Sequence, residues 1–594
     1  MINLFYVFFA HATPTQNNLS SSPCSTSSQN HLSGRLAKQK NYTLMKSTSK
    51  WSSMGIDGRA VIDRCTKASG LKPNLYIVDM KFSKIGVLLF NQDSSRLSDQ
   101  ISNKASHVSF LLLPTQLFDH DFLTCLAGEC SQSDFIESKI IGESYLNLIV
   151  DATDISPEEE YDYIVVGGGT AENYVVNLYE ANDRDSPARR FTSEDGIPNF
   201  RGRILGGSSM INFGIYSRAD GNFYARTGIK WDMGAVKKAY EWVEESVVFG
   251  TDKLTTWESS VRDALLESNI GPDNGFTLDH VVGAKVTGAT FDQTGRRHGS
   301  VELLNKANPE NLRVIVNATV EKLNFSSSES SGALGSPQLL LLSGVGPRPH
   351  LTSLNIPVVL DQPFISQFMY DPPRNYINLV APFPIGIESH AIGISRDGFA
   401  INDLSGATPF YSPVSEILFP DPSPPINLSV ATIAAKLTRI QSSGSLQLAS
   451  ATNISINPNV RFNYFSNPED LSRCSNMIRY VANMISTPSM EAYKFQGLKG
   501  EKSFLFVGTS LAENESDSGT LEVFCRKTLR TIYHYHGGCT IGKVVDSDLK
   551  AIGIKALRIV DGSTFPTASG TNPQATLMML GRYIGLKMKE ERSA

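Results

Sequence analysis

The sequence predicts an α/β fold, in which buried strands alternate with helices. Three observations support this prediction. A short apolar run, Tyr163 to Val166, leads into a glycine turn at residues 167–169. Residues 231–247 carry apolar side chains at helical spacing. A second long helical segment follows Pro573 near the C-terminus, and strand-like runs lie between the two helices.

The segment 231–247 is expected to form an amphipathic helix. Its apolar positions share one face, and they are Trp231, Val236, Ala239, Tyr240 and Val243. Two later segments, 312–323 and 556–565, are rich in β-branched and aliphatic residues and predict buried strands.

A further helix is expected over residues 336–346. Ser336 is predicted to cap it, Pro337 lies in its first turn, and Gly344 lies near its end. The last helix of the chain is expected to begin at Pro573, because proline is favoured at the first helical position.

Composition and charge exclude several classes of protein. Of the 594 residues, 41% are hydrophobic and 19% are charged, as in ordinary globular proteins with about two to four domains at this length. The net charge of −5 gives no reason to expect a nucleic-acid partner. No apolar run approaches the roughly 20 residues that a membrane-spanning helix needs. No cluster of cysteines or histidines has the spacing of a metal site.

Residues 1–150 stay unassigned, and the serine-rich stretch 17–30 predicts partial disorder. The first twelve residues end in a small-x-small pattern without preceding positive charges, so a signal peptide and an ordinary N-terminus both stay open. Seven N-x-Ser/Thr acceptors mildly favour a secretory route. They begin at Asn18, Asn41, Asn317, Asn324, Asn427, Asn453 and Asn514.

The glycine turn predicts an incomplete dinucleotide site. Gly167 and Gly169 occupy the first two glycine positions of such a turn, but Glu172 occupies the third. The acid that would bind the ribose is Glu180. A strand over Tyr174–Tyr179 leaves only four connecting residues, whereas parallel strands need a crossover of about a dozen. The helix that should face the pyrophosphate is therefore expected to be missing.

Four further motifs follow in a set order. They are "GRILGGSSMINFG" at 202–214, "GALGSPQLLLLSGVGP" at 332–347, "YHYHGG" at 533–538 and "GTNPQATLMMLG" at 570–581. With "YIVVGGGTA", they make the chain from about residue 150 onward resemble the glucose–methanol–choline (GMC) oxidoreductases. Within that family it is most similar to the plant branch of HOTHEAD-type proteins and (R)-mandelonitrile lyases.

This resemblance implies a Rossmann-like FAD-binding domain with an inserted α+β substrate-binding domain. The FAD domain would begin over 158–347, the substrate domain would span 348–520, and residues 521–594 would return to the FAD domain with the catalytic segment. Residues 181–192 and the bridge Ser326–Ser331 stand where the family has longer segments, so several family segments are missing.

The resemblance also implies the FAD contacts. Residues near the glycine turn would be Gly167, Gly169, Thr170, Ala171 and Glu180, and those along the flavin would be Ile204, Ser208, Asn212, Phe213, Gly214 and Ile215. The remaining contacts would be Val320, Tyr533, Gly562, Pro573 and Gln574. For the Gly-Gly-Ser-Ser turn, the residue types support the same interpretation. Its glycines allow a ligand to approach the backbone closely, and its N–H groups can donate hydrogen bonds to that ligand.

The family's catalytic base is a histidine followed by glycine at the third and eighth positions. His534 fits this pattern with Gly537 and Gly542, and His536 is a weaker alternative. The second active-site residue would be Asn572. In this mechanism His534 takes the proton of an alcohol, the carbinol carbon passes hydride to the flavin, and Asn572 holds the oxygen.

Two other functions stay open at this point. A hydroxynitrile lyase would use the same base, but related lyases carry histidine where this chain has Asn572, and asparagine cannot exchange a proton. A non-catalytic or unstable remnant is favoured by the incomplete glycine turn. The resemblance further implies a disulfide between Cys474 and Cys525, with two separate thiols as the alternative, and leaves Cys539 unpaired.

Overall fold

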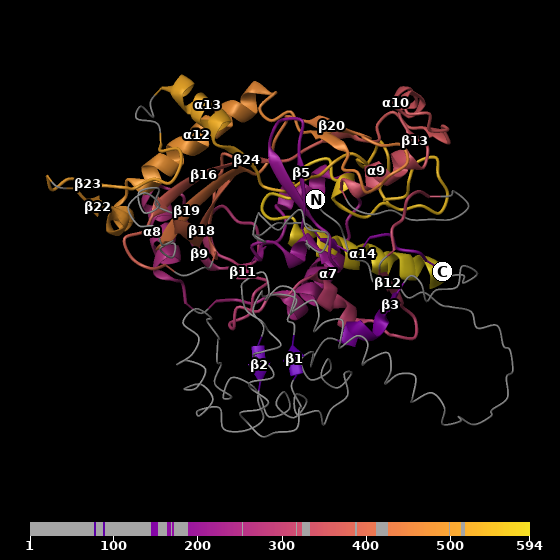
Figure 1. The fold of residues 1–594 in the computed structure, drawn as a ribbon, viewed down its shortest axis with the longest axis horizontal. Helices are drawn as coiled ribbons and strands as arrows, with labels where there is room; N and C mark the ends of the chain where they lie inside the picture. Colours follow the sequence, from indigo (N-terminus) through magenta and orange to yellow (C-terminus); the bar gives the residue numbers. More distant parts are fainter. Residues whose placement is uncertain are drawn as a thin grey trace, which may run out of the picture. The chain divides into compact units, whose positions relative to one another are not determined.

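The computed structural model (Figure 1) describes residues 144–151, 163–167, 169–170, 188–251, 253–316, 318–323, 333–385, 389–410, 426–497, 499–511 and 517–593. Two short strands, β1 (Tyr76–Val78) and β2 (Val87–Leu89), are also described and pair antiparallel. They belong to a unit separate from the one that contains residues 144–594. No helix in these ranges is long and apolar enough to span a membrane.

A seven-stranded sheet is the largest in the described chain, in the order β24-β16-β19-β18-β17-β10-β9. All neighbouring pairs are antiparallel except β10 and β9. The strands are β9 (Asp273–Phe276), β10 (Gly283–Val286), β16 (Pro373–Val380), β17 (Ala391–Ile394), β18 (Phe399–Phe410), β19 (Ile426–Leu437) and β24 (Leu529–Thr531).

Alternation along the strands gives this sheet two different faces. On β19, Ile433, Ala435 and Leu437 are buried in a core with helices α8 (Thr256–Glu267) and α12 (Pro468–Ile485). The residues between them point to the opposite face. That opposite face forms part of the candidate site.

Helices α7 (Met233–Val247) and α14 (Gln574–Ser593) pack against each other in a second core. The predicted helix is confirmed, and the Asp232 side chain caps it by accepting hydrogen bonds from the amides of Gly234 and Ala235. Val236, Ala239, Tyr240 and Val243 are buried as expected, whereas Trp231 precedes the helix and is half-buried. The last helix begins one residue after Pro573.

The helix predicted over 336–346 is also present, as α9 (Gly335–Leu342), but the expected cap is wrong. The Ser336 hydroxyl donates to Asp561 Oδ2 at 2.6 Å, and no side chain caps the helix. Gly344 follows the helix with a φ of +80°, and a Cβ there would lie 2.3 Å from the Pro357 carbonyl oxygen. Glycine is therefore required at this position.

Outside the seven-stranded sheet, parallel strand pairs in the described chain are short. The pairs are β3 (Ile149–Asp151) with β12 (Val314–Val316), β4 (Gly169–Thr170) with β7 (Gly206–Gly207), and β13 (Val345–Gly346) with β14 (Leu360–Asp361). Each pair has only two or three residues per strand. An extended parallel FAD-domain sheet is not present among the described residues.

Three strand predictions are corrected accordingly. Residues 163–167 have no regular structure, and β12 covers only three residues of the predicted segment 312–323 and is half-exposed. Residues 556–565 are largely buried, but they form a loop with one isolated bridge and a short 3-10 helix. A strand needs a neighbour for its N–H and C=O groups, and the described chain supplies few such neighbours here.

The remaining elements are short and surround these two cores. The strands are β5 (Ala188–Thr192), β6 (Pro198–Gly202), β8 (Ile215–Tyr216), β11 (Gly288–Ala289), β15 (Gln367–Met369), β20 (Gly444–Gln447), β21 (Asn459–Arg461), β22 (Phe495–Gln496) and β23 (Lys502–Ser503). The helices are η2 (Ser144–Leu148), η4 (Ser208–Met210), α6 (Gly221–Arg226), η5 (Ser300–Lys306), α10 (Arg348–Ser353), η6 (Pro488–Tyr493), α13 (Ser518–Lys527) and η7 (Gly562–Thr564). The domain boundaries 158–347, 348–520 and 521–594 stay predictions.

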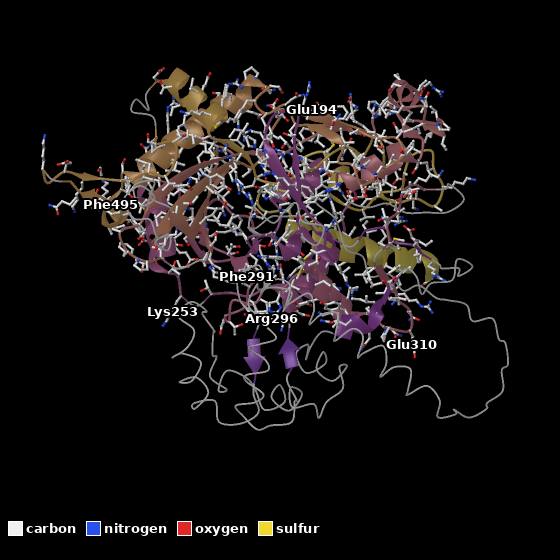
Figure 2. The ribbon with its side chains drawn as sticks, in the orientation of Figure 1. Glu194, Lys253, Phe291, Arg296, Glu310 and Phe495 are labelled. Atoms are coloured by element: carbon white, nitrogen blue, oxygen red, sulfur yellow. A yellow bond between two sulfur atoms is a disulfide. The ribbon has the colours of Figure 1, made fainter. Side chains whose placement is uncertain are left out.

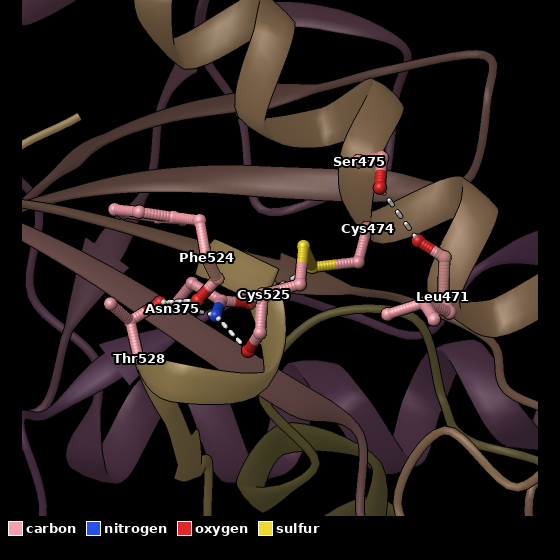
Figure 3. The surroundings of a disulfide bond; sticks show 7 residues. All are labelled: Asn375, Leu471, Cys474, Ser475, Phe524, Cys525 and Thr528. Carbon is pink, nitrogen blue, oxygen red and sulfur yellow. Dashed lines mark hydrogen bonds between the residues drawn. A yellow bond between two sulfur atoms is a disulfide. The ribbon is translucent and has the colours of Figure 1, made fainter. Parts of the chain in front are cut away.

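A disulfide joins Cys474 on α12 to Cys525 on α13, with a Cα–Cα distance of 6.3 Å (Figure 3). Beside it, the Asn375 amide donates to the Cys525 carbonyl at 2.9 Å and to the Thr528 hydroxyl at 2.8 Å. These bonds tie strand β16 to α13. The predicted pairing is confirmed, and Cys539 is a buried free thiol.

Candidate active site

Two cavities meet at His534, which lines both of them. The first is lined by Phe213, Ile215, Arg374, Asn402, Leu404, Ala434, Lys436, Ile532, Tyr533, His534 and Asn572. The second is lined by Pro372, His534, His536, Phe565, Ala568, Ser569, Gly570, Thr571 and Pro573. The two predicted catalytic residues, His534 and Asn572, therefore share the first cavity.

The backbone around His534 is held in a defined conformation. His534 lies three residues after the end of β24, and its amide donates to Asp371 Oδ1 at 3.0 Å. Gly537 has a φ of +86°, and a Cβ there would lie only 1.8 Å from the Phe368 carbonyl oxygen. Gly542 also has a positive φ, of +78°. The glycines at the third and eighth positions thus serve the backbone path that presents His534.

Burial and neighbouring cations determine the charge of His534. Its side chain is buried, and this burial together with the Lys436 and Arg374 cations holds its pKa well below the ordinary value. His534 is therefore neutral near pH 7, which is the form that can accept a proton.

His536 has a different setting. Its Nδ1 lies 3.0 Å from the His534 carbonyl oxygen, and its ring stacks on Tyr370 with centroids 5.0 Å apart. Burial lowers the pKa of His536 to about 4. It lines only the second cavity, so it does not face the pocket that contains Asn572.

Asn572 is oriented by a buried lysine. The Lys436 ammonium donates to Asn572 Oδ1 at 3.0 Å, and both side chains are almost fully buried. Asparagine has an amide N–H₂ group as well as this carbonyl oxygen. With its oxygen bound to Lys436, Asn572 has a defined orientation beside His534.

The sheet face opposite α12 forms the floor of the first cavity. Arg374 on β16 pairs with Lys436 on β19, and Asn402 on β18 pairs with Ala434 on β19. Residues paired across strands share a face, and so do residues two apart along one strand. This register brings three polar side chains together on one apolar sheet.

Sequence reasoning missed Arg374, Lys436, Asn402 and Asp371. A signal existed for Lys436, because it is a lone cation in the otherwise apolar end of β19. Such a residue is either paired or functional when it is buried. Nothing in the sequence marks which cross-strand partners it meets.

The segment predicted to lie along the flavin is partly assembled around Asn212. Asn212 Nδ2 donates to Gln574 Oε1 at 2.8 Å, and Gln574 Nε2 donates to the Ile215 carbonyl at 2.6 Å. Phe213 and Ile215 line the first cavity, whereas Ile204 is 45% exposed. The structure therefore brings most of this predicted group together but leaves Ile204 at the surface.

An arginine absent from the predictions supports the same segment. Arg297 Nη1 donates to Asn212 Oδ1 at 2.8 Å, and the Gly214 amide donates to the same oxygen at 2.8 Å. The Arg297 guanidinium stacks over the ring of Phe291, 4.2 Å from its centroid; Phe291 is labelled in Figure 2. These contacts fix Asn212 on both of its amide atoms.

The two glycine turns lie side by side. Gly169 and Thr170 pair in parallel with Gly206 and Gly207, and Gly167 has a φ of +100°. The hydroxyl of Ser208 accepts a 2.9 Å hydrogen bond from the Gly202 amide. The predicted contacts Ala171 and Glu180 lie outside the described residues.

The other predicted cofactor contacts do not share one cavity. Gly562 accepts a hydrogen bond from the Gly537 amide at 3.0 Å, and Pro573 lines the cavity. Tyr533 lines the first cavity, with the Arg374 guanidinium 5.5 Å from its ring centroid. Val320 is half-buried against the second core, away from both cavity linings.

The second cavity contains two buried hydroxyl groups that could bind a polar ligand group. The hydroxyls of Ser569 and Thr571 are buried and have no hydrogen-bond partner among the described residues. Buried hydroxyls without partners cost free energy unless a ligand or water satisfies them. The described ranges contain no cluster of metal-ligating side chains.

Comparison with known proteins connects this site to a family. A family model described as GMC oxidoreductase matches residues 441–581. A sinalpyl alcohol oxidase from Nesocodon mauritianus is 51% identical over 515 residues, covering 76% of this chain and 92% of that protein. An (R)-mandelonitrile lyase-like protein from Arabidopsis thaliana is 44% identical over 515 residues, covering 75% of this chain and 93% of that protein.

A solved structure shows the fold at much lower identity. A formate oxidase from Aspergillus oryzae, studied for modification of its FAD, is 16% identical with a TM-score of 0.55. It covers 68% of this chain and 88% of the formate oxidase chain.

The alignments also support the prediction that family segments are missing. A share of 76% of 594 residues is about 451 residues, whereas the alignment to the alcohol oxidase spans 515 positions. About 64 aligned positions therefore have no residue in this chain. Nevertheless, the high identity over nearly the whole length of that relative is decisive, and the chain belongs to the GMC oxidoreductase family.

Proposed function

We propose that the protein oxidises the CH–OH group of a small alcohol, with His534 as the catalytic base and FAD as the cofactor. The observation that carries this proposal is the position of His534. It is buried and neutral, it lines two cavities, and it shares the first of them with Asn572. The similarity to a sinalpyl alcohol oxidase supports an alcohol as substrate.

The residues present fit the flavin end of an FAD. The unpartnered hydroxyls of Ser569 and Thr571 line the second cavity, which also adjoins His534. Pro573 and the amide group of Gln574, held against Ile215, would complete this end of the site. The chemistry that a bound flavin supplies is acceptance of a hydride from the carbinol carbon.

The chain's own residues handle the proton and the oxygen. Neutral His534 accepts the hydroxyl proton of the alcohol. The Asn572 amide, oriented by Lys436, holds the substrate oxygen. The Lys436 cation, bound to Asn572, stabilises the negative charge that develops on this oxygen in a site where little water screens it.

Cyanohydrin cleavage is the second candidate, because a cation that stabilises an alkoxide would also stabilise a leaving cyanide. The similarity to an (R)-mandelonitrile lyase-like protein supports it. Asn572 argues for the oxidase, since an amide cannot exchange a proton in the way a second histidine can.

We further propose that the protein follows the secretory route. The disulfide between Cys474 and Cys525 is typical of oxidising compartments. Of the seven glycosylation acceptors, Asn453 is exposed and Asn427 lies in β19. The other five, Asn18, Asn41, Asn317, Asn324 and Asn514, lie outside the described residues.

The first test is the visible absorbance spectrum of the full chain purified from a secretory host. A flavin spectrum that benzyl alcohol bleaches without oxygen, and that His534→Ala leaves unbleached, supports the oxidase. Benzaldehyde release from mandelonitrile without bleaching identifies a lyase, and Asn572→His should increase that release. A folded but colourless protein would contradict both enzymes and favour the non-catalytic remnant.

A further inference from the structure

Asn402 is a buried polar side chain that lacks a partner. It is 5% exposed, and its Nδ2 has no hydrogen-bond partner among the described residues. It lines the first cavity from the sheet floor. An amide N–H₂ left unsatisfied in the interior costs free energy, which a bound acceptor removes. Asn402 therefore marks a place for a hydrogen-bond acceptor on the ligand.

The surroundings of Asn402 favour a negatively charged acceptor. The guanidinium of Arg374 and the ammonium of Lys436 line the same cavity, and no aspartate or glutamate is among its described lining residues. Asp403, the next residue of β18, points to the other face, where its Oδ1 accepts the Ala391 amide at 3.0 Å. Burial raises the pKa of Asp403 well above the ordinary value, so it adds no compensating charge.

Asp371 is not among the lining residues of the first cavity, and both of its carboxyl oxygens accept hydrogen bonds. One oxygen accepts the His534 amide and the other accepts the Tyr464 hydroxyl. The floor formed by Arg374, Lys436 and Asn402 is therefore a cationic site with an open donor. The rest of the lining includes Phe213, Ile215 and Leu404, which suit an apolar carbon skeleton.

We infer that the first cavity selects alcohols that carry a carboxylate, which Arg374 and Asn402 on the floor bind, while Lys436 stays with Asn572. This inference rests on the proposed oxidase function and names its substrate class. The carbinol lies at His534 and Asn572, and an apolar ring or short chain separates it from the carboxylate.

The kinetic test compares 4-(hydroxymethyl)benzoate with benzyl alcohol, which share the ring and the carbinol. The full chain should show a kcat/KM at least about tenfold higher for the carboxylate, since hydrogen bonds to charged groups contribute more than those between neutral groups. Asn402→Leu should lower that ratio about tenfold. Asn476→Leu, on α12 and outside the cavity lining, should leave it unchanged. Equal kcat/KM values for the two alcohols would overturn the inference.

A binding test separates this inference from the proposed oxidation. Benzoate binding to the full chain is measured by isothermal titration calorimetry, which needs no turnover. The inference expects binding that Asn402→Leu weakens at least about tenfold, whereas Asn476→Leu does not. Loss of alcohol oxidation with retained, Asn402-dependent benzoate binding would reject the oxidase but keep the carboxylate site. If benzoate did not bind, or bound equally to the wild type, Asn402→Leu and Asn476→Leu, the inferred carboxylate site would be wrong.

A charge-reversal variant keeps the test informative if Asn402→Leu fails to fold. Asn402→Asp retains the shape of the side chain but places a carboxylate on the floor. It should abolish benzoate binding, because its carboxylate repels that of benzoate and pairs with the neighbouring cations. Unchanged benzoate affinity in folded Asn402→Asp would contradict the inference.

Discussion

The backbone amide of His534 donates a 3.0 Å hydrogen bond to Oδ1 of Asp371, whose side chain is fully buried. The second oxygen of Asp371 accepts the Tyr464 hydroxyl. Asp371 follows β15 and lies more than 160 residues before His534 in the sequence. One carboxyl group therefore joins the candidate base to a distant part of the chain.

This carboxyl group makes stability depend on pH. Burial raises the pKa of Asp371 to about 6, above its ordinary value of 3.8, so the folded state holds the proton more tightly than the unfolded chain. The resulting stabilisation is fully present below about pH 4 and is lost as pH rises through about 6. Asp371→Asn keeps an oxygen for the His534 amide but removes this titration.

We expect the unfolding free energy of Asp371→Asn, relative to the wild type, to increase by about 2 kcal/mol from pH 4 to pH 7. Urea unfolding at a series of pH values measures this difference. The comparison cancels carboxylates that titrate in both proteins. A difference that stays constant over this pH range would contradict the assigned titration.

Lys436→Met should move the acid limb of alcohol oxidation to higher pH. The Lys436 cation is one cause of the low pKa of His534, and its removal raises that pKa toward the ordinary value. His534 must be neutral to act as the base, so the variant loses activity at a higher pH than the wild type. Anaerobic stopped-flow flavin reduction measures the two profiles.

The control for this prediction is Lys237→Met, at a surface position of α7 where the lysine side chain is 71% exposed. Its pH profile should match that of the wild type. If Lys436→Met and Lys237→Met gave the same acid limb, Lys436 would not act on His534.

Gly537→Ala should destabilise the protein more than Gly508→Ala. The two glycines have φ values of +86° and +89°, so both substitutions carry the cost of about 1–2 kcal/mol for a left-handed residue. A Cβ at Gly508 meets no atom within 4 Å, whereas one at Gly537 would lie 1.8 Å from the Phe368 carbonyl oxygen. Thermal unfolding of the two variants gives the difference, and equal melting temperatures would refute the close approach.

Removal of the disulfide should lower stability by about 4 kcal/mol, because it closes a loop with a sequence separation of 51. The double variant Cys474→Ala, Cys525→Ala is compared with the wild type by thermal unfolding, with and without reductant. Reductant should lower the melting temperature of the wild type and leave that of the variant unchanged. A wild-type melting temperature that does not respond to complete reduction would be inconsistent with a stabilising crosslink.

Much of the local structure was predictable because it depends on short-range patterns. The helical spacing of 231–247 places Val236 and Tyr240 in the core, as observed in α7. The histidine motif, read through its family resemblance, identifies His534 and Asn572, which line one cavity. The same resemblance identifies Cys474 and Cys525, which are bonded. These features lie within continuous segments or recurring motifs.

Strand predictions failed where a strand depends on partners. The apolar residues 163–166 have the composition of a buried strand, yet they form none, because hydrogen-bonded neighbours decide whether an extended segment becomes a sheet. The prediction that Ser336 caps helix α9 was wrong for a similar reason. A better partner, Asp561, lies 225 residues away and accepts its hydroxyl.

The residue order of the chain thus specifies the family, the helices and the histidine that can act as a base. Tertiary structure alone decides the chemistry of the pocket, because the register of β16, β18 and β19 brings Arg374, Lys436 and Asn402 onto one face. It also decides the protonation of His534, since burial and two cations remote in sequence lower its pKa. Register, burial and charge are relationships between distant segments, and no single segment contains them.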